Sequence, residues 1–437
     1  IAAQMSQPIA ESPMPGGIEA VTRLLKDASQ VALNTTGGGY LAYVPGGGLF
    51  PAAMADLIAG TFNRFTGLSG AAPAFVRFEA DVLAWLCAEF GYGPEARGIF
   101  TSGGSQANLS AMVAARHKYF GDTGDFRGAR VYTSEQAHHS ISKSLRLAGL
   151  PGDALRVVPV DDAMRMSLNP LRNMVQDDIA AGRRPLAIVA AAGTTNTGAI
   201  DPLSGVAALC REFDMWLHVD GAYGGAFVLC PEGSKRLNGI EQADSITFDP
   251  HKGLFLPYGT GCLLVREGQA LLAAHDSQAA YLQDFDTFGH GGAPPSPTSY
   301  SPELSRPYRG LRLWLPLMLF GAGAFRDALS EKIQLAQTLY DAMVAAQVPI
   351  EVLHPPQTSA IGFRMQRLED ETLESWNTRN ADWLHAINAR QRVHLSSTTI
   401  ASPEGAIFTL RVCVLSFRTH AQNIDQCLED LLATMPT

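Results

Sequence analysis

The chain has 437 residues, of which 46% are hydrophobic and 17% are charged, a composition typical of a globular protein with a substantial core. The formal net charge is −9 and no block of basic residues is present, which excludes the electrostatic footprint of a protein that binds nucleic acid or an anionic membrane. The longest strongly apolar stretch, residues 313–325, contains Pro and Gly. It is shorter than the roughly 20 residues of a transmembrane helix, so we expect a core helix.

The cysteines are scattered and none forms a CxxC pair, so we expect reduced thiols in a cytoplasmic protein. They are Cys87, Cys210, Cys230, Cys262, Cys413 and Cys427. The N-terminal residues show neither a basic segment nor an apolar core of a secretory signal. The first residue is Ile1 rather than Met, which leaves open whether residues precede it.

Residues 1–68 are predicted to form an N-terminal arm or subdomain that packs on another part of the protein. A Pro- and Gly-rich lead is followed by a predicted helix at 17–28. A glycine-rich stretch at 35–48 then precedes a second predicted helix at 51–61.

From residue 77 onward, short apolar runs alternate with stretches of helical periodicity. The strand-like runs are 98–101, 130–133, 156–160, 185–191, 215–219, 245–248 and 261–265. This alternation predicts βαβ units and a large, mostly parallel sheet. Ligands of such sheets bind in loops beyond the carboxyl ends of the strands.

Periodicity is lost over residues 276–307, which are rich in Gly and Pro. A long aperiodic segment inside a compact domain is usually a functional lid or is disordered. A long helix is predicted at 308–328, and strand-like runs follow at 361–365, 393–399 and 408–412. We therefore predict a large cofactor-binding α/β domain at 69–320 and a small C-terminal α+β domain at 321–437.

A glycine-rich turn between a predicted strand and a predicted helix reads Ser-Gly-Gly-Ser and includes Gly104 and Ser105. Glycines permit close backbone approach, and a helix N-terminus binds anions. The alternative is a turn in which Ser simply caps the helix. The fingerprints GxxxxGK[ST] and GxGxxG are absent at this turn.

Two further strand ends carry charged side chains. Asp220 ends a predicted strand before Gly221, and Lys252 follows another apolar strand, directly after His251. A carboxylate at this position points into the crevice, and a lysine there is a candidate for Schiff-base chemistry. A turn aspartate and a surface lysine are the plain alternatives.

Paired histidines, His138 and His139, follow another strand. We predict no metal site, because neither Cys nor a carboxylate stands nearby at ligand spacing and the chain has no HExxH.

Together these strand ends supply a phosphate cradle, a flat imidazole, a carboxylate and an amine. These groups suit pyridoxal 5′-phosphate: a helix N-terminus for the phosphate, an imidazole on the ring face, a carboxylate for the pyridinium nitrogen and a lysine for the aldehyde carbon. The set is far more specific than any one of its members.

At these residues the sequence resembles the group II pyridoxal-phosphate-dependent amino acid decarboxylases, a family that includes aromatic-L-amino-acid, histidine, glutamate and 2,4-diaminobutyrate decarboxylases. The resemblance covers roughly residues 40–419. The matching segments read GTTNTGAID at 193–201, WLHVDGAYGG at 216–225, ADSITFDPHKG at 243–253 and RGLRLW at 309–314.

The resemblance implies a fold of the type I aminotransferase class and a homodimer with its active site at the interface. It also implies roles for individual residues. Lys252 corresponds to the lysine that binds the cofactor, Asp220 to the partner of the pyridine nitrogen, and His138, not His139, to the stacking histidine.

The remaining implied residues line the cofactor. Ala222 packs under the ring, Gly104 and Ser105 form the phosphate cradle, and Thr195 and His251 lie beside the cofactor. In the family a Tyr on a mobile loop from the partner subunit is linked to protonation of Cα. Residues 276–307 match that loop and hold Tyr281 and Tyr300, of which we favour Tyr300.

The chain departs from the family around the substrate pocket. Gly37 and Gly38 replace a His-Pro pair, Gly253 replaces a Trp, and Arg77 replaces an acid. Arg77 is a candidate reader of the substrate carboxylate, or an ordinary surface residue of a helix. These changes leave cofactor use intact but put the identity of the substrate in question.

We therefore predict decarboxylation of an L-amino acid to its amine and CO₂, with an aromatic substrate favoured. The alternatives are a decarboxylase of 2,4-diaminobutyrate or an acidic amino acid, and a transaminase, lyase or aldehyde-forming enzyme on the same fold. A cofactor-binding scaffold without catalysis is a third class, against which intact Lys252, Asp220 and His138 argue.

Overall fold

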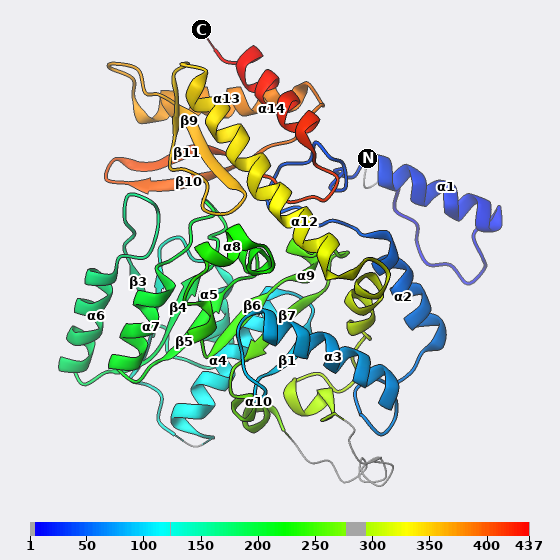
Figure 1. Cartoon of the computed structure of the whole chain (residues 1–437). Coiled ribbons are helices and arrows are strands. Elements are labelled where there is room, and N and C mark those ends of the chain that lie inside the picture. The colour runs from blue at the N-terminus through cyan, green and yellow to red at the C-terminus, as the bar shows by residue number, and fades with distance from the viewer. Residues whose placement is uncertain (1–4, 123, 277–293, 437) are drawn as a thin grey trace.

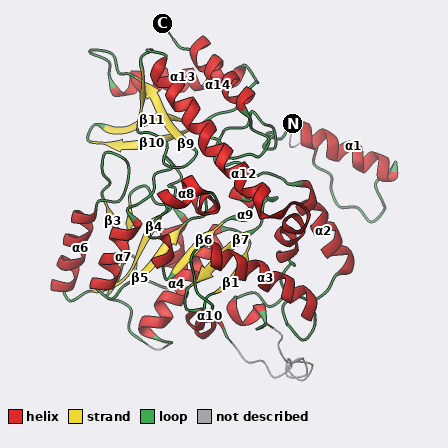
Figure 2. Cartoon of the chain, in the orientation of Figure 1, coloured by secondary structure: helices red, strands yellow, loops and turns green. Residues whose placement is uncertain are grey.

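The protein is described by a computed structural model that covers residues 5–122, 124–276 and 294–436. A large sheet with helices on both faces forms the lower body of the molecule in Figure 1, and a smaller sheet with its own helices lies above it. Figure 2 shows the large sheet surrounded by helices and the strands of the small sheet with helices beside them.

The bounds of the described elements follow in chain order. The α-helices are α1 (Gly17–Gln30), α2 (Phe50–Phe62), α3 (Pro73–Glu89), α4 (Gly104–Phe120), α5 (Ser140–Leu147), α6 (Leu168–Ala180), α7 (Leu203–Glu212), α8 (Pro231–Arg236), α9 (Pro250–Gly253), α10 (Gly268–His275), α12 (Gly310–Ala345), α13 (Leu373–Ala389) and α14 (Ala421–Ala433). The 3₁₀ helices are η2 (Gly224–Leu229), η3 (Ile240–Gln242) and η5 (Pro297–Tyr300). The strands are β1 (Arg97–Thr101), β2 (Ala129–Ser134), β3 (Leu155–Val158), β4 (Arg184–Ala191), β5 (Trp216–Asp220), β6 (Ser245–Phe248), β7 (Gly261–Val265), β8 (Ile350–Val352), β9 (Ala360–Met365), β10 (Ser396–Ser402) and β11 (Gly405–Cys413).

The large sheet has seven strands in the order β1-β7-β6-β5-β4-β2-β3. The pairs β6–β5, β5–β4, β4–β2 and β2–β3 are parallel, whereas β7 runs antiparallel to both of its neighbours. The prediction of a large, mostly parallel sheet is confirmed. Central strands of such a sheet are covered on both faces and therefore read as continuous apolar runs, as the fully buried end of β4 does.

Helices cover both faces of this sheet. On one face, α4, α5 and α10 pack against the strands through a cluster that includes Ala107, Ala111, Ile141 and Leu271. On the other face, α3, α6, α7 and the start of α12 pack through a second cluster. The small side chains of α4 allow this helix to lie close to the strands, which brings its N-terminus to their carboxyl ends.

The small sheet is antiparallel, in the order β10-β11-β9-β8. Its core lies between the strands and the helices α12, α13 and α14. β8 was not expected from the sequence, because it is only three residues long and only partly buried.

α12 connects the two sheets and is interrupted at Gly321, which has φ 70°. This left-handed backbone favours glycine, and it changes the direction of the helix. The predicted boundary between residues 320 and 321 falls at this interruption. The division into three domains stays a prediction.

The expectation that residues 313–325 form a core helix is wrong in part. Leu313 and Leu317 are buried, but Met318, Leu319 and Phe320 are more than half exposed. α12 packs on α2 and α3, and a helix that is apolar all round cannot bury every side against neighbours that cover only part of it. No helix among the described residues is long and apolar enough to cross a membrane.

A buried ion pair ties α3 to the segment before α12. The guanidinium Nη1 of Arg306 lies 2.8 Å from Oε1 of Glu79, and both side chains are at most 2% exposed. The backbone N–H of Gly310 donates to Oε2 of the same carboxylate at 3.1 Å. Glu79 therefore fixes the start of α12 against α3.

We predict that Arg306→Met lowers the free energy of unfolding by about 3–5 kcal/mol, because it leaves the Glu79 carboxylate buried without its cation. The shift of the urea unfolding midpoint measures this change. Arg367→Met removes an ion pair with Glu404, whose side chain is 62% exposed, and serves as the control with a much smaller expected shift. Equal shifts for the two variants would contradict the structural role of the buried pair.

Candidate active site

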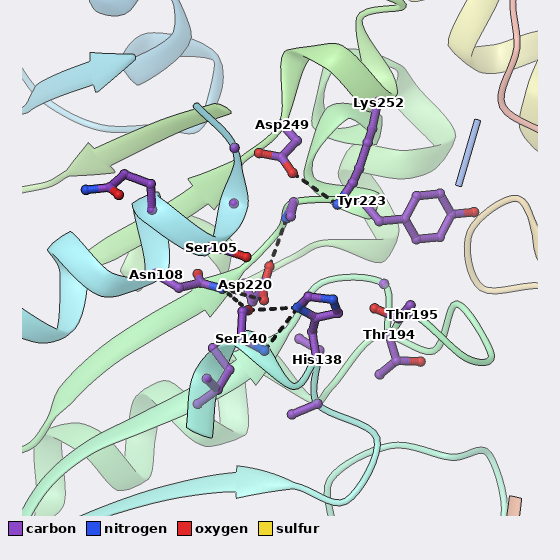
Figure 3. Close-up of a pocket in the computed structure, with 18 of the residues that line it drawn as sticks. Ser105, Asn108, His138, Ser140, Thr194, Thr195, Asp220, Tyr223, Asp249 and Lys252 are labelled. Atoms are coloured by element: carbon purple, nitrogen blue, oxygen red, sulfur yellow. Dashed lines mark hydrogen bonds and ion pairs between the residues drawn. The ribbon is translucent and has the colours of Figure 1, made fainter. Parts of the chain in front are cut away.

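A cavity of about 390 Å³ lies at the carboxyl ends of the parallel strands. Turns that follow β1, β2, β4, β5 and β6 line it together. Eight residues singled out in the sequence are brought together in this lining: Gly104, Ser105, His138, Thr195, Asp220, Ala222, His251 and Lys252. Figure 3 shows the side chains of Ser105, His138, Thr195, Asp220 and Lys252 around the same space.

Lys252 lies in the short helix α9, where its Nζ is 3.0 Å from Oδ2 of the buried Asp249. Burial acts to lower the pKa of Lys252, but the carboxylates of Asp249 and Asp220 outweigh burial, and the net effect is a raised pKa. The amine is therefore cationic in the unliganded site at neutral pH. It must lose a proton before it can attack a carbonyl carbon.

Asp220 is the last residue of β5. Its Oδ2 accepts a hydrogen bond from Nδ2 of Asn108 at 2.9 Å, and its Oδ1 accepts one from the backbone N–H of Ala222 at 3.1 Å. The carboxylate is thus oriented by two donors on different elements, and it faces the cavity (Figure 3).

The imidazole of His138 lines the cavity, whereas His139 does not belong to the lining. Nδ1 of His138 is 2.8 Å from the hydroxyl of Ser140. Burial lowers the pKa of His138, against the opposing effect of Asp220. The structure therefore presents a neutral ring at the position that the sequence singled out, in the register of the first histidine of the pair.

The N-terminus of α4 opens onto the cavity. Its N-cap is Gly103, and no side chain caps the helix, so the reading of this turn as a serine-capped helix start is wrong. A Cβ at Gly104 would lie 3.0 Å from the Asp249 carboxylate and 3.1 Å from Cβ of Ala222. Glycine is required there because the turn passes directly against the β5 and β6 ends, which leaves the first amides of the helix open to an anion.

His251 is oriented by a hydrogen bond of its own. Its Nδ1–H donates to the backbone carbonyl of Thr260 at 2.7 Å, and burial lowers its pKa. The ring of Tyr258 lies with its centroid 5.8 Å from that of His251 and also lines the cavity.

Tyr300 is not brought to Lys252 within the chain. It is buried in the cluster between the sheet and α10, and it lines a separate cavity with Pro294 and Ile99. Tyr281 lies outside the described residues, as does most of the predicted lid. The donor role of Tyr300 in a partner's site stays a prediction.

Arg77 lies on α3, its side chain is about half exposed, and it is 3.8 Å from the carboxylate of Asp81 one turn along the helix. It lines the same separate cavity as Tyr300. Its position agrees with the plain reading of a surface helix residue.

Sequence reasoning missed four residues that the fold brings to the cavity: Asn108, Asp249, Thr194 and Tyr223. Asp249 stands three residues before Lys252, a spacing that places two side chains on one side of a helical turn. Asn108 stands one helical turn after Gly104, which is the available signal that it faces the same site. Tyr223 is hydrogen-bonded to Ser359, which directly precedes β9 of the small sheet, and no local pattern reveals that contact.

Known proteins resemble this chain over most of its length. The pyridoxal-dependent decarboxylase conserved domain matches residues 11–366. An aromatic-L-amino-acid decarboxylase of Bacillus atrophaeus is 34% identical over 401 residues, which cover 90% of this chain and 80% of that protein. An L-2,4-diaminobutyrate decarboxylase of Acinetobacter baumannii is 28% identical over 400 residues, with 87% and 76% covered.

Among solved structures, the tryptophan decarboxylase of Catharanthus roseus in complex with L-tryptophan has the same fold, with a TM-score of 0.88 at 24% identity. The match covers 99% of this chain and 91% of that one. The expected fold class is confirmed.

We predict that Asp249→Asn moves the covalent capture of pyridoxal phosphate to lower pH. The carboxylate is one of the charges that raise the pKa of Lys252; without it the pKa falls, and more of the amine is uncharged at a given pH. Borohydride trapping of the apoprotein with the cofactor, followed by quantification of the labelled Lys252 peptide against pH, measures the effect.

The exposed Asp162→Asn is the matched control and leaves the profile unchanged. A profile that stays in place or moves to higher pH in Asp249→Asn contradicts the electrostatic coupling.

Proposed function

The chain belongs to the family of pyridoxal-dependent decarboxylases, and on that premise we propose that it converts an aromatic L-amino acid to the corresponding amine and CO₂. Pyridoxal 5′-phosphate is its cofactor. The observation that carries the proposal is one cavity in which a lysine, a carboxylate, a neutral imidazole and an uncapped helix N-terminus face one another.

The residues of the cavity fit this cofactor. An uncapped helix start suits a phosphate dianion, since the first N–H groups and the helix dipole both favour negative charge. One oxygen of the buried Asp249, Oδ1, makes no hydrogen bond among the described residues, which is typical of a site that is completed by a ligand. The volume of about 390 Å³ lies in the range of small-molecule sites.

We assign the roles as follows. The first turn of α4, with Gly104 and Ser105, would hold the phosphate, and Asp220 would hold a proton on the pyridine nitrogen. His138 and Ala222 would enclose the ring between them, and Thr195 and His251 complete its surroundings. Lys252 would bind the aldehyde carbon.

When bound, the cofactor supplies an electron sink for the electron pair that the departing carboxylate leaves on Cα. The residues of the chain would favour the protonated pyridine nitrogen, the form that withdraws electrons most strongly. Asp220 accepts two hydrogen bonds, which orient its oxygens, and its negative charge would favour the protonated pyridine nitrogen. Nζ of Lys252 lies 3.0 Å from Oδ2 of Asp249, so a carboxylate stands within reach of the proton that the amine must lose before it reacts.

The charges around the cavity favour an aromatic over a diamino or acidic substrate. Among the described lining residues the carboxylates are Asp220 and Asp249, and both already have partners. The described lining also contains no arginine. A second carboxylate on the substrate would find no arginine in this lining, and a second ammonium would find only carboxylates that already bind Lys252 or Asn108, whereas the ring of Tyr258 offers an apolar face.

A CO₂-release assay over a panel of amino acids, with analysis of the organic product, tests this proposal. We expect release from tryptophan, tyrosine or phenylalanine with the amine as product, and loss of release in Lys252→Ala. Release only from 2,4-diaminobutyrate or glutamate refutes the substrate class. An aldehyde or keto acid as main product, without amine, assigns the chain to one of the alternative reactions.

We also propose a homodimer, on the basis of an apolar face formed by α2 and α12. Phe50, Met54 and Leu57 lie on one side of α2, and Met318, Leu319 and Phe320 lie on the adjoining part of α12; all are at least 41% exposed. α1 buries none of its residues and stands apart from the body (Figure 1). Large apolar faces of this kind mark protein interfaces, and a second copy of the chain is the partner that the family resemblance implies.

We predict that the chain elutes with twice its mass of 46.7 kDa and that the double variant Leu57→Glu, Phe320→Glu becomes monomeric, because two charges per chain would be buried at the interface. Light scattering coupled to gel filtration measures the mass. Leu368→Glu, which alters an exposed residue of the small domain, is the control. A monomeric parent chain would refute the dimer.

A cytoplasmic location belongs to the same proposal. The six cysteines are all buried free thiols, a state that a reducing compartment maintains.

A further inference from the structure

Behind Asp220 lies a continuous run of buried, hydrogen-bonded side chains. Nε1 of Trp216 is 2.8 Å from Oγ of Ser245, which is 2.8 Å from Nδ1 of His218. Nε2 of His218 is 2.9 Å from Oδ1 of Asn108, and Nδ2 of Asn108 is 2.9 Å from Oδ2 of Asp220. The first four side chains are at most 1% exposed.

Strand geometry explains this alignment. Trp216, His218 and Asp220 alternate along β5 and therefore point to the same face of the sheet. Ser245 is the β6 partner of His218 in the ladder. Asn108 reaches the same face from α4, which packs on β5 and β6.

The two ends of the run determine where every hydrogen lies. The indole N–H of Trp216 can only donate, and an ionised carboxylate can only accept. Nδ2 of Asn108 donates to Asp220, so Oδ1 of Asn108 accepts and Nε2 of His218 carries a hydrogen. A neutral His218 then accepts at Nδ1 from the hydroxyl of Ser245, which itself accepts from Trp216.

Charge fixes the orientation of the Asn108 amide. Its oxygen accepts from His218 and also from the hydroxyl of Thr247 at 2.6 Å. The reversed amide would place its oxygen against the Asp220 carboxylate and its N–H groups against two donors. Burial lowers the pKa of His218 to about 4, against the opposing effect of Asp220, which agrees with a neutral ring.

The second N–H of the Asn108 amide donates to Ser140, which is hydrogen-bonded to His138. Nδ2 of Asn108 lies 3.0 Å from Oγ of Ser140, and that hydroxyl lies 2.8 Å from Nδ1 of His138. The backbone N–H of Ser140 also points at Nδ1 of His138, at 3.3 Å, so Nδ1 is an acceptor and the hydroxyl of Ser140 donates to it. The hydrogen of the neutral His138 ring is therefore on Nε2; Figure 3 shows the contacts that join Asn108, Ser140 and His138.

We propose that Asn108 is a positioning residue of this site: its amide donates to Asp220, which orients that carboxylate as an acceptor, and donates to Ser140, which turns the Ser140 hydroxyl toward Nδ1 of His138 and favours the tautomer with its hydrogen on Nε2. The inference rests on the proposed function for the roles of Asp220 and His138 toward the cofactor. Asn108 acts on the pyridine nitrogen and the ring face only through these neighbours. Every hydrogen bond of the run points toward Asp220, so the dipoles add at the carboxylate.

The variant Asn108→Asp tests this inference, since it keeps the shape of the side chain but replaces the donor N–H groups with a second acceptor. Two facing carboxylates share a proton, and Asp220 loses the donor that orients it. We expect the affinity of the apoprotein for pyridoxal phosphate to fall about tenfold or more, the effect of losing a hydrogen bond to a charged group. The absorption band of the bound cofactor should also change, and kcat should fall while KM stays nearly constant.

Asn380→Asp is the matched control. Asn380 is a fully buried asparagine of the small domain, whose amide bridges Met365 and Trp376. It carries the same cost of a buried new carboxylate, but it lies outside the cavity lining, so cofactor affinity and spectrum should not change. If Asn108→Asp melts no lower than Asn380→Asp and binds the cofactor with the affinity and spectrum of the parent, the inference is wrong.

A second measurement does not depend on the Asn108→Asp variant. In ¹⁵N-histidine spectra of the unmutated apoprotein at neutral pH, the His138 ring, assigned by its absence in His138→Ala, should be neutral with its hydrogen on Nε2. A hydrogen on Nδ1 overturns the inference even when the parent binds cofactor and releases CO₂. A parent chain that binds no pyridoxal phosphate refutes the proposed function instead, and leaves the tautomer measurement to decide the hydrogen-bond run.

Discussion

The site depends on one constraint of the large sheet: strands that run in the same direction end at the same edge. β2, β4, β5 and β6 are parallel, and β1 runs with them because β7 between β1 and β6 is reversed. The turns that follow these five strands therefore converge. Residues as far apart in the chain as Gly104 and Lys252 meet in one cavity for this reason, and the helices on both faces hold the strands in the order that brings them there.

A cavity formed in this way removes ionisable groups from water, and burial of a charge must be compensated. The site satisfies this condition in two ways. Lys252 forms an ion pair with Asp249. Asp220 accepts hydrogen bonds from the Asn108 side chain and from the backbone N–H of Ala222. Burial lowers the pKa of the imidazoles of His138, His218 and His251. The lysine is then the principal cation that faces the cavity.

The polar run behind Asp220 gives this arrangement its precision. A fully satisfied buried network restricts each member to one orientation, whereas a half-satisfied network destabilises the fold. Here a tryptophan at one end and a carboxylate at the other leave a single assignment of hydrogens through Ser245, His218 and Asn108. The same residues pack α4 onto β5 and β6, so the geometry of the site and the stability of the domain share these contacts.

The sequence alone determined the parts of the protein that depend on local pattern. Alternation of apolar runs and helical periodicity identified the parallel sheet, and the residues at strand ends identified Asp220, His138, Lys252 and the turn at Gly104, because strand ends and turn glycines are local features. The resemblance to a family added the cofactor and the reaction. A local pattern does not indicate which residues far apart in the chain come into contact. Asn108, which contacts Asp220, and Tyr223, which contacts Ser359, were missed for this reason.

Only the tertiary structure decided the contacts between elements. It placed Tyr300 in the lining of a separate cavity, left Met318–Phe320 exposed within a stretch expected in the core, and joined Asn108 to both Asp220 and Ser140. Each of these outcomes depends on which neighbours cover a residue. Hydrophobic spacing specifies that a side of a helix is buried, but the packing of α12 against α2 and α3, and of α4 against β5 and β6, decides which side chains meet.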